Sequence, residues 1–419
     1  MHRMGLPVEN SGFAPLSIMD FQAEIDKCAA GCGGVVNVPS GVHVIGTLVL
    51  RDGVELHLEH GAILKGSGNV DDYPKIAESF IEGCGQSLGR AMILAENARN
   101  IAITGEKGSR ILGEQAPFLK GMQGFEVRPF LLRFVGCRNV RIEGVELGES
   151  AAWCCVIQNC DDVEIRDVVI ENHGTVNNDG IDIDSSRHVL VEHCSVSSDD
   201  DSLVLKTTFS TENSDIEVRN CQFKSLGGAI KFGTESYGDM RRIHIHDCRI
   251  VGGEGGAIKV FSVDGAICED IRIENISIRN ATLPMFLRLG RRCRTYHSKQ
   301  NAKTAGEMRR LVFRNIHGEI IQHPRCVGHS CLTVMGLPDK KVSDVLFDDV
   351  DLQMPGELRN DVPKPDDVPE CETAYPEIGY FGTIPASCIF QRHASNVKYE
   401  RCNFTLTAMD SRPEKVILE

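Results

Sequence analysis

The chain has 419 residues, of which 42% are hydrophobic and 25% are charged, and its formal net charge is −14. This composition is ordinary for a water-soluble globular protein, and no apolar run reaches the roughly 18 residues that a membrane-spanning helix needs. The acidic balance argues against nucleic acid or an anionic membrane as the main partner, because both favour a basic face. A local cluster of Lys and Arg could still bind an acidic substrate.

The N-terminal residues lead directly from Met1 into polar sequence, without the apolar core and small-residue cleavage site of a secretory signal. We expect a cytoplasmic location if Met1 is the true start, and a periplasmic or secreted one if a leader was removed. The 17 cysteines are an odd number, which disfavours a fully disulfide-bonded fold. Because no pair of Cys-x-x-Cys units has zinc spacing, we expect neither a metal nor a cofactor.

The first predicted element is a short amphipathic helix within residues 14–30. Phe21, Ile25 and Cys28 have helical spacing, and the glycines of 31–34 follow. Such a helix would cover the open end of a repeat fold, whose first coil otherwise exposes apolar surface and strand edges.

A short strand pattern then recurs along the chain. Each copy alternates apolar and polar residues, as a half-buried strand does, and Gly, Asn and Asp mark the bends between copies. The first six copies are spaced by 23, 26, 27, 27 and 28 residues, which leaves no room for a crossover helix. The copies begin at Val140, Val163, Val189, Ile216, Ile243 and Ile271, with later ones at Leu311, Val345 and Val397.

This period predicts an all-β fold, a single-stranded right-handed parallel β-helix of about ten coils. The competing leucine-rich repeat has a leucine and asparagine pattern that is missing here. We expect residues 1–419 to form one domain, with an inserted loop at 291–307 and a C-terminal loop segment at 355–392. Three successive copies place Cys194, Cys221 and Cys248 at one interior position, where free cysteine fills the core as a small apolar residue.

Acidic residues gather at two places that are one coil apart. Asp179, Asp182 and Asp184 form the first cluster, and residues 199–201, all aspartate, form the second. Asp179 and Asp200 are 21 residues apart, and neighbouring strands lie about 4.8 Å apart, so both clusters should meet on one face. Glycoside hydrolysis needs such paired carboxyl groups. The alternatives are an aspartate ladder that caps turns, or a calcium site.

These motifs resemble those of glycoside hydrolase family 28, the polygalacturonases and their relatives. An Asn-x-Asp motif ends at Asp179, and an Asp-Asp motif follows at 200–201. Segments 33–41 and 61–67 are similar to the family's first coils, and 375–386 is similar to the tail of many bacterial members, so the resemblance covers nearly the whole chain.

The resemblance implies an inverting hydrolysis with Asp200 as general acid, and with Asp179 and Asp201 activating the water. Asn178 would orient the first aspartate. The other possible register, with Asp199 and Asp200 as the pair, fits the 21-residue spacing less well.

Two motifs of polygalacturonases are incomplete. Gly228 stands where they have the histidine of Gly-His-Gly, and Ala257 stands where they have the arginine of Arg-Ile-Lys, although Lys259 remains. Neither alanine nor one lysine replaces an arginine fork that binds a sugar carboxylate. Rhamnogalacturonan hydrolases of the family also lack the histidine, which implies a different sugar near the cleavage point.

A basic strip could still hold an acidic sugar, since Lys206, Lys231 and Lys259 recur at spacings of 25 and 28. Alternatively, Lys206 and Lys231 only neutralise the aspartates. His173 and Glu235 could line the cleft, or each could be a plain turn or surface residue. The predicted substrate-binding set is Asn178, Lys206, Gly228, Lys231, Glu235, Lys259, Arg288 and His173.

The sequence therefore predicts a glycosidase that cleaves O-glycosidic bonds in pectin-related oligosaccharides or polysaccharides, with neither nucleic acid nor membrane as partner. Loop 291–307 could wall the groove and convert it into an exo-acting pocket. The alternatives are a non-catalytic carbohydrate-binding β-helix, and a hydrolase or lyase for a non-pectic sugar. A lyase would want a basic proton abstractor and usually calcium, and the retained aspartates point away from it.

Overall fold

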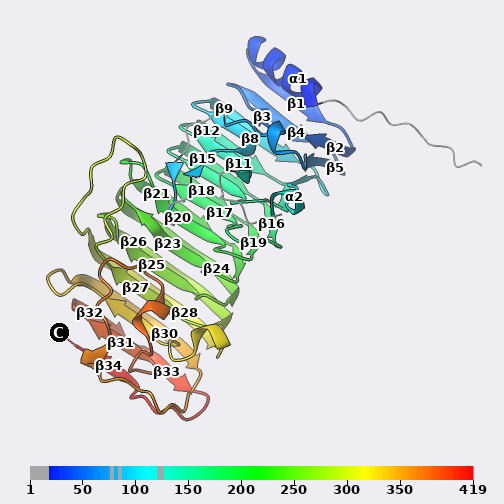
Figure 1. The fold of residues 1–419 in the computed structure, drawn as a ribbon. Coiled ribbons are helices and arrows are strands. Elements are labelled where there is room, and N and C mark those ends of the chain that lie inside the picture. The colour runs from blue at the N-terminus through cyan, green and yellow to red at the C-terminus, as the bar shows by residue number, and fades with distance from the viewer. Residues whose placement is uncertain (1–17, 76–79, 84–86, 120–126, 419) are drawn as a thin grey trace, which may run out of the picture.

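The computed structural model describes residues 18–75, 80–83, 87–119 and 127–418. Short strands stack on one another in chain order from the N-terminal helix to the C-terminal end, so the molecule is one elongated solenoid (Figure 1). Within the described residues, the stacked strands pair in parallel, and the antiparallel exceptions are one short hairpin and one isolated bridge. The predicted right-handed parallel β-helix is confirmed.

One face of the solenoid is a sheet of twelve strands in the described chain, and it carries the candidate site. Its strands are β3 Leu48–Val49, β8 Ala91–Glu96, β11 Phe130–Val135, β14 Cys155–Gln158, β17 Ile181–Asp184, β20 Leu203–Thr207, β23 Ile230–Ser236, β25 Ile258–Ser262, β27 Met285–Leu289, β29 Leu332–Met335, β31 Ile389–Arg392 and β34 Lys415–Ile417.

The other described strands of the solenoid belong to one continuous sheet of twenty, which bends around the remaining faces. They are β1 Gly34–Val38, β2 Gly41–Ile45, β4 Val54–Leu58, β5 Ala62–Gly66, β9 Arg99–Gly105, β10 Arg110–Leu112, β12 Arg138–Glu143, β13 Glu146–Gly148, β15 Asp161–Arg166, β16 Val169–Asn172, β18 Arg187–Glu192, β19 Ser195–Ser198, β21 Asn213–Arg219, β22 Gln222–Ser225, β24 Met240–Gly253, β26 Ile267–Ala281, β28 Glu307–Ile320, β30 Val342–Met354, β32 Ala394–Glu400 and β33 Asn403–Leu406.

The register of this sheet matches the repeat found in the sequence. Val140 pairs with Val163, which pairs with Val189, and the series continues strand by strand to Val397. The side chains of these leading residues point into the core, since Val140 and Val189 are 1% and 2% exposed. A slip by one residue would turn every apolar side chain outward, so the alternation fixes the register.

Asparagine and aspartate occupy most of the bends with left-handed φ values, as expected, and His188, Arg242 and Arg310 occupy others. Asn100, Asn139 and Asp162 have φ values of 54°, 56° and 58°, in the left-handed region that short polar side chains tolerate best after glycine. The amide of Asn139 donates to Oδ1 of Asn100 at 2.8 Å, and Asn315 donates to Asn275 at 2.7 Å. Stacked coils therefore bond to each other through their bend residues.

The cysteines behave as core residues. Cys194, Cys221 and Cys248 are each 2% exposed, and the backbone N–H of Cys194 donates to Sγ of Cys221 in the next coil at 3.4 Å. None of the cysteines in the described ranges forms a disulfide. The prediction that they fill the interior is confirmed.

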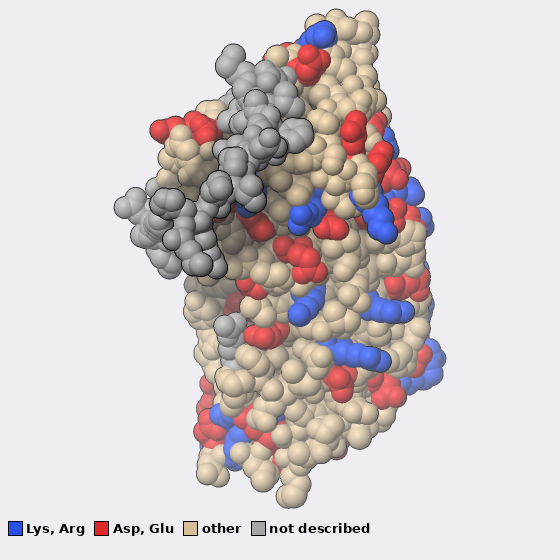
Figure 2. Space-filling view, turned by 90° about the vertical axis from the view of Figure 1, so that its right-hand side faces the viewer, with Lys and Arg blue, Asp and Glu red and all other residues tan. Residues whose placement is uncertain are grey.

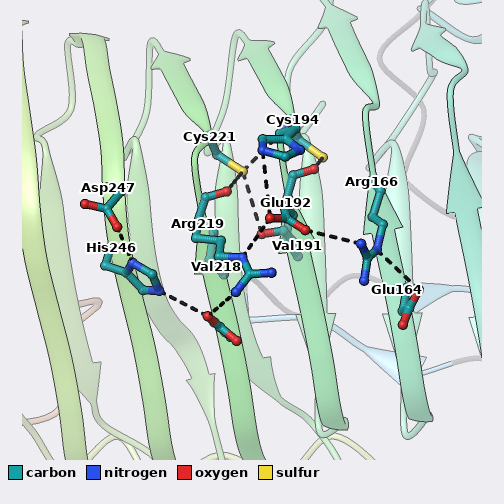
Figure 3. A network of polar contacts seen from close by, with 12 residues as sticks. Glu164, Arg166, Val191, Glu192, Cys194, Val218, Arg219, Cys221, His246 and Asp247 are labelled. Carbon is teal, nitrogen blue, oxygen red and sulfur yellow. Dashed lines mark hydrogen bonds and ion pairs between the residues drawn. The ribbon is translucent and has the colours of Figure 1, made fainter.

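Ion pairs join neighbouring coils on the outer surface of the larger sheet (Figure 3). Glu192 accepts from Arg219 at 2.8 Å and faces Arg166 at 3.3 Å, and Glu217 faces His246 at 3.2 Å. Like charges stacked at this spacing would destabilise the sheet, and alternating signs avoid that cost. The face drawn in Figure 2 likewise shows acidic and basic side chains interspersed.

The remaining elements lie at the ends and sides. Helix α1, Ile18–Ala30, packs Phe21 and Ile25 into the core beside the first coils. Residues 14–17 of the expected helix lie outside the described residues. Helix α2 is Ala116–Leu119, and the hairpin consists of β6 Phe80–Ile81 and β7 Ser87–Leu88.

Two long connections interrupt the stacked strands. One separates β27 from β28, and the other separates β30 from β31. The second connection contains only short 3-10 turns, at Pro365–Asp367 and Ile378–Phe381, and strand β31 occupies the end of the segment expected as loop. Among the helices of the described chain, none combines the length and the apolar character needed to span a bilayer.

Candidate active site

The candidate site lies at the amino ends of β17, β20 and β23. Asp179 precedes β17, Asp200 and Asp201 precede β20, and Gly228 precedes β23. Backbone hydrogen bonds stack these segments, since Gly180 N donates to Asp201 O at 2.9 Å and Ser202 N donates to Gly228 O at 3.0 Å. The two acidic clusters therefore meet on one face, as the one-coil spacing predicts.

The three aspartates share a small pocket. Aromatic and basic side chains from several coils complete it. The pocket is lined by Glu82, Trp153, Asn177, Asp179, Asp200, Asp201, Lys206, Lys231, Gly233, Glu235 and Tyr375.

Asp201 is held as a carboxylate. Its Oδ2 lies 2.6 Å from Nζ of Lys231, and its Oδ1 accepts from the backbone N–H of Gly228 at 2.6 Å. Burial raises the pKa of Asp201, but the charges of Lys231 and Lys259 together with these hydrogen bonds lower it below its usual value. The carboxylate form is therefore available as a base across the neutral range.

The pKa of Asp200 is shifted in the opposite direction from that of Asp201. Burial, together with the charges of Asp179 and Asp201, raises the pKa of the Asp200 carboxyl to about 8. Its Oδ1 accepts a hydrogen bond from the backbone N–H of Asp201 at 3.0 Å. A carboxylic acid that stays protonated at neutral pH can donate a proton to a leaving group.

Asp179 shares one lysine with a further buried carboxyl group. Nζ of Lys206 lies 3.0 Å from Asp179 and 2.8 Å from Asp182, and it sits 3.2 Å from the ring centre of Trp153. Burial raises the pKa of Asp179, and it raises that of Asp182 to about 7. One cation for two carboxylates leaves a negative charge uncompensated, so this pair is unusually basic.

The other aspartates of the two clusters lie outside the pocket. Asp184 is fully buried and accepts from the N–H and the hydroxyl of Thr208, at 2.7 and 2.5 Å, and from Gln158 at 3.0 Å. Asp199 binds His173 at 2.7 Å and the N–H of Gly174 at 2.7 Å. The register that pairs Asp200 with Asp201 is thus the one that fits the pocket.

Several predicted substrate-binding residues lie at the site. The pocket lining includes Glu235, Lys206 and Lys231. Both lysines are bound to aspartate carboxylates, which supports the alternative that the two lysines neutralise the aspartates. Asn178 is buried and donates to Asn172 O at 2.7 Å, which fixes the backbone just before Asp179.

Gly228 leaves little room for a side chain. A Cβ at this position would come within 3.0 Å of Asp201 Oδ1, and within 3.4 and 3.5 Å of the side chains of Lys259 and Lys231.

Five members of the predicted substrate-binding set are not among the residues that line the pocket, namely Asn178, Gly228, Lys259, Arg288 and His173. Arg288 is 1% exposed, and its guanidinium donates to the carbonyls of Gly336 and Glu370. Its register partner is Phe261, whereas the partner of Lys259 is Phe286, so the basic strip ends at Lys259. His173 is held on the exposed side by Asp199 and by Glu171, at 3.2 Å.

Four residues at the site were not predicted from the sequence patterns. Trp153 is the single tryptophan of the chain. Tyr375 lines the pocket from the C-terminal connection, Glu82 lines it from the β6–β7 hairpin, and Glu377, also in the C-terminal connection, reaches the site through its ion pairs with Lys259 and Lys231. Trp153 precedes β14 in the coil before that of Asp179, whereas Tyr375, Glu377 and Glu82 lie in connections outside the repeat.

A family model described as glycosyl hydrolases family 28 matches residues 37–369. A sequence named probable polygalacturonase from Vitis vinifera is 23% identical over 285 residues, which are 63% of this chain and 57% of that protein. The endo-polygalacturonase of Pectobacterium carotovorum subsp. carotovorum is 22% identical over 70% of this chain and 76% of its own. The chain spans about half the length of the plant relatives that it matches. The matched part is 44% of the length of the polygalacturonase of Juniperus ashei.

Solved structures agree on the fold. The exopolygalacturonase of Thermotoga maritima has a TM-score of 0.66 at 22% identity and covers 80% of this chain and 82% of its own. The family 28 exopolygalacturonase of Yersinia enterocolitica has a TM-score of 0.72 at 16% identity, over 95% of this chain and 74% of its own. With the family model matching most of its length, the chain belongs to glycosyl hydrolase family 28.

Proposed function

We propose that this protein is a glycosidase that hydrolyses O-glycosidic bonds in pectin-related oligosaccharides or polysaccharides by single displacement. Asp200 donates a proton to the leaving oxygen, and Asp201 with Asp179 activates the water. The observation that carries this proposal is the pair of adjacent carboxyl groups in one pocket, one with a raised pKa and one with a lowered pKa. Environments that push the pKa values of two carboxyl groups apart in this way identify one group as the acid and the other as the base.

Attack by water on the face opposite the leaving group inverts the anomeric carbon. The related polygalacturonases support a pectic substrate.

Two connections meet at one side of the pocket, which supports exo action. The backbone N–H of Gly83 in the hairpin donates to Glu235 at 2.7 Å, and its carbonyl accepts from Arg292 at 3.5 Å and from Arg294. Ile81 N donates to Tyr296 O at 3.3 Å. A groove walled at one side admits a chain end more readily than the middle of a polymer.

The test is release of reducing ends from homogalacturonan, rhamnogalacturonan and neutral oligosaccharides. The Asp200→Asn variant should lose about 10²- to 10⁴-fold in rate, the usual contribution of a general acid. Asp199→Asn is the matched control, since its carboxylate is adjacent in sequence but binds His173 outside the pocket. No release from any substrate by the unmodified protein, or equal loss in both variants, would contradict the proposal.

A further inference from the structure

Glu377 places a carboxylate on the lysines beside the proposed catalytic group. Its Oε2 lies 2.7 Å from Nζ of Lys259, and its Oε1 lies 3.7 Å from Nζ of Lys231. Lys231 in turn binds Asp201 at 2.6 Å. Glu377 thus bridges the two cations that could otherwise receive a substrate carboxylate.

The charges of this group balance within the protein. Lys231 and Lys259 carry two positive charges, and Asp201 and Glu377 carry two negative ones. Lys206 is shared between Asp179 and Asp182, so it offers no spare positive charge either. A carboxylate entering here would meet no uncompensated lysine and would be repelled by Glu377 and Asp201.

Burial makes this balance hard to rearrange. The side chains of Lys259 and Lys231 are 2% and 6% exposed, whereas that of Glu377 is 30% exposed. Removing the partner of a buried cation is strongly unfavourable, so a substrate carboxylate would have to replace Glu377 rather than join it. The exposed part of Glu377 remains able to accept hydrogen bonds from sugar hydroxyls.

We infer that Glu377 is a specificity-determining residue. It makes the sugar-binding position beside Lys231 and Lys259 select a sugar unit without a free carboxylate. A neutral sugar and a methyl-esterified uronate share this property. The inference rests on the proposed function for the nature of the ligand, and it narrows that function by excluding a free uronate at this position.

Binding to catalytically blocked protein tests the inference separately from turnover. In an Asp200→Asn background, calorimetric titration compares a de-esterified oligogalacturonide, its methyl-esterified form and a rhamnogalacturonan oligosaccharide. At least one of the two ligands with an uncharged unit, the esterified or the rhamnose-containing one, should bind more tightly than the free acid. The tighter of these two shows whether the uncharged unit is a methyl-esterified uronate or a neutral sugar.

Adding Glu377→Gln should tighten binding of the free acid about 10-fold, because the charge of Lys259 is no longer matched. Glu372→Gln is the matched control, since Glu372 lies in the same connection with 33% exposure and faces Arg291 at 3.1 Å. The gain should disappear when Lys259→Met is combined with Glu377→Gln.

The inference is overturned if the Glu377→Gln variant prefers the uncharged ligands over the free acid as strongly as its parent does. It is also overturned if the parent protein binds the free acid more tightly. In either case, hydrolysis by the unmodified enzyme leaves the proposed function standing. Failure of all three ligands to bind contradicts both. Thermal unfolding of each variant checks that the fold is retained.

Discussion

Asp200 and Asp201 are adjacent in the chain, yet their carboxyl groups are shifted in opposite directions. Only Asp201 contacts Lys231 and the N–H of Gly228, while Asp200 has burial and two neighbouring carboxylates against its ionisation. The family resemblance implies that Asp200 is the acid and Asp201 a base, but the residue pattern does not predict the opposite shifts of their pKa values. The difference depends on which side chain of the following coil faces each carboxyl group.

The pH dependence of kcat/KM should be bell-shaped. Activity needs Asp200 protonated, so the rate should fall as the pH rises through about 8. It also needs an ionised base: for Asp201, whose pKa is lowered, the acidic limb should lie below the usual carboxyl range, and a limb above that range would assign the base to Asp179, whose pKa is raised by burial. Measurement over pH 3 to 10 checks this; an alkaline limb near the ordinary carboxyl value of about 4 would contradict the role of Asp200.

Replacing Lys231 with Met should move the acidic limb upward. The substitution removes the ion pair at 2.6 Å and leaves Asp201 buried, so its pKa should rise. The same pH profile measures the shift. An acidic limb that stays in place would show that Lys231 does not hold Asp201 ionised.

At the scale of the element, strand β17 separates two carboxylates that the sequence grouped together. Asp182 and Asp184 lie on the same side of the strand, as alternation predicts, but Asp182 faces Lys206 whereas Asp184 binds the backbone and side chain of Thr208. The period of the strand indicates the face of a residue. It does not indicate which polar group of the next coil will be its partner.

Asp184→Ala should destabilise the protein by about 3 kcal/mol, because Thr208 and Gln158 would lose a buried acceptor. Urea unfolding followed by circular dichroism measures the change. Asp199→Ala provides the comparison, since Asp199 is partly exposed, and its loss should cost no more than about 1 kcal/mol. Equal losses in the two variants would contradict the structural role of Asp184.

At the scale of the whole molecule, the repeat predicts the solenoid and its register, whereas the contacts that close the site are not periodic. Gly83 binds Glu235 from 152 residues away, and Glu377 binds Lys259 from 118 residues away. Loop–loop contacts of this kind depend on three-dimensional packing and carry no spacing signal. The guanidinium of Arg288 likewise donates to the carbonyl of Glu370 in the C-terminal connection, a contact that the repeat does not predict.

The end of the solenoid should be sensitive to the cap. Ile25 of α1 is fully buried against the first coils, so Ile25→Asp should lower the free energy of unfolding by about 3 kcal/mol or more and expose strand edges that promote association. Thermal unfolding and light scattering measure both effects. Glu24→Gln on the exposed side of the helix should change neither, and equal behaviour of the two variants would contradict capping by α1.

The stereochemistry of hydrolysis tests the central claim most directly. Proton NMR spectra taken in the first minutes of the reaction, on whichever pectic oligosaccharide the enzyme cleaves, identify the anomer that is released before mutarotation. Single displacement by water with Asp200 as acid predicts inversion at the anomeric carbon. Release of the retained anomer would contradict the mechanism, because it would require one of these aspartates to form a covalent bond to the sugar.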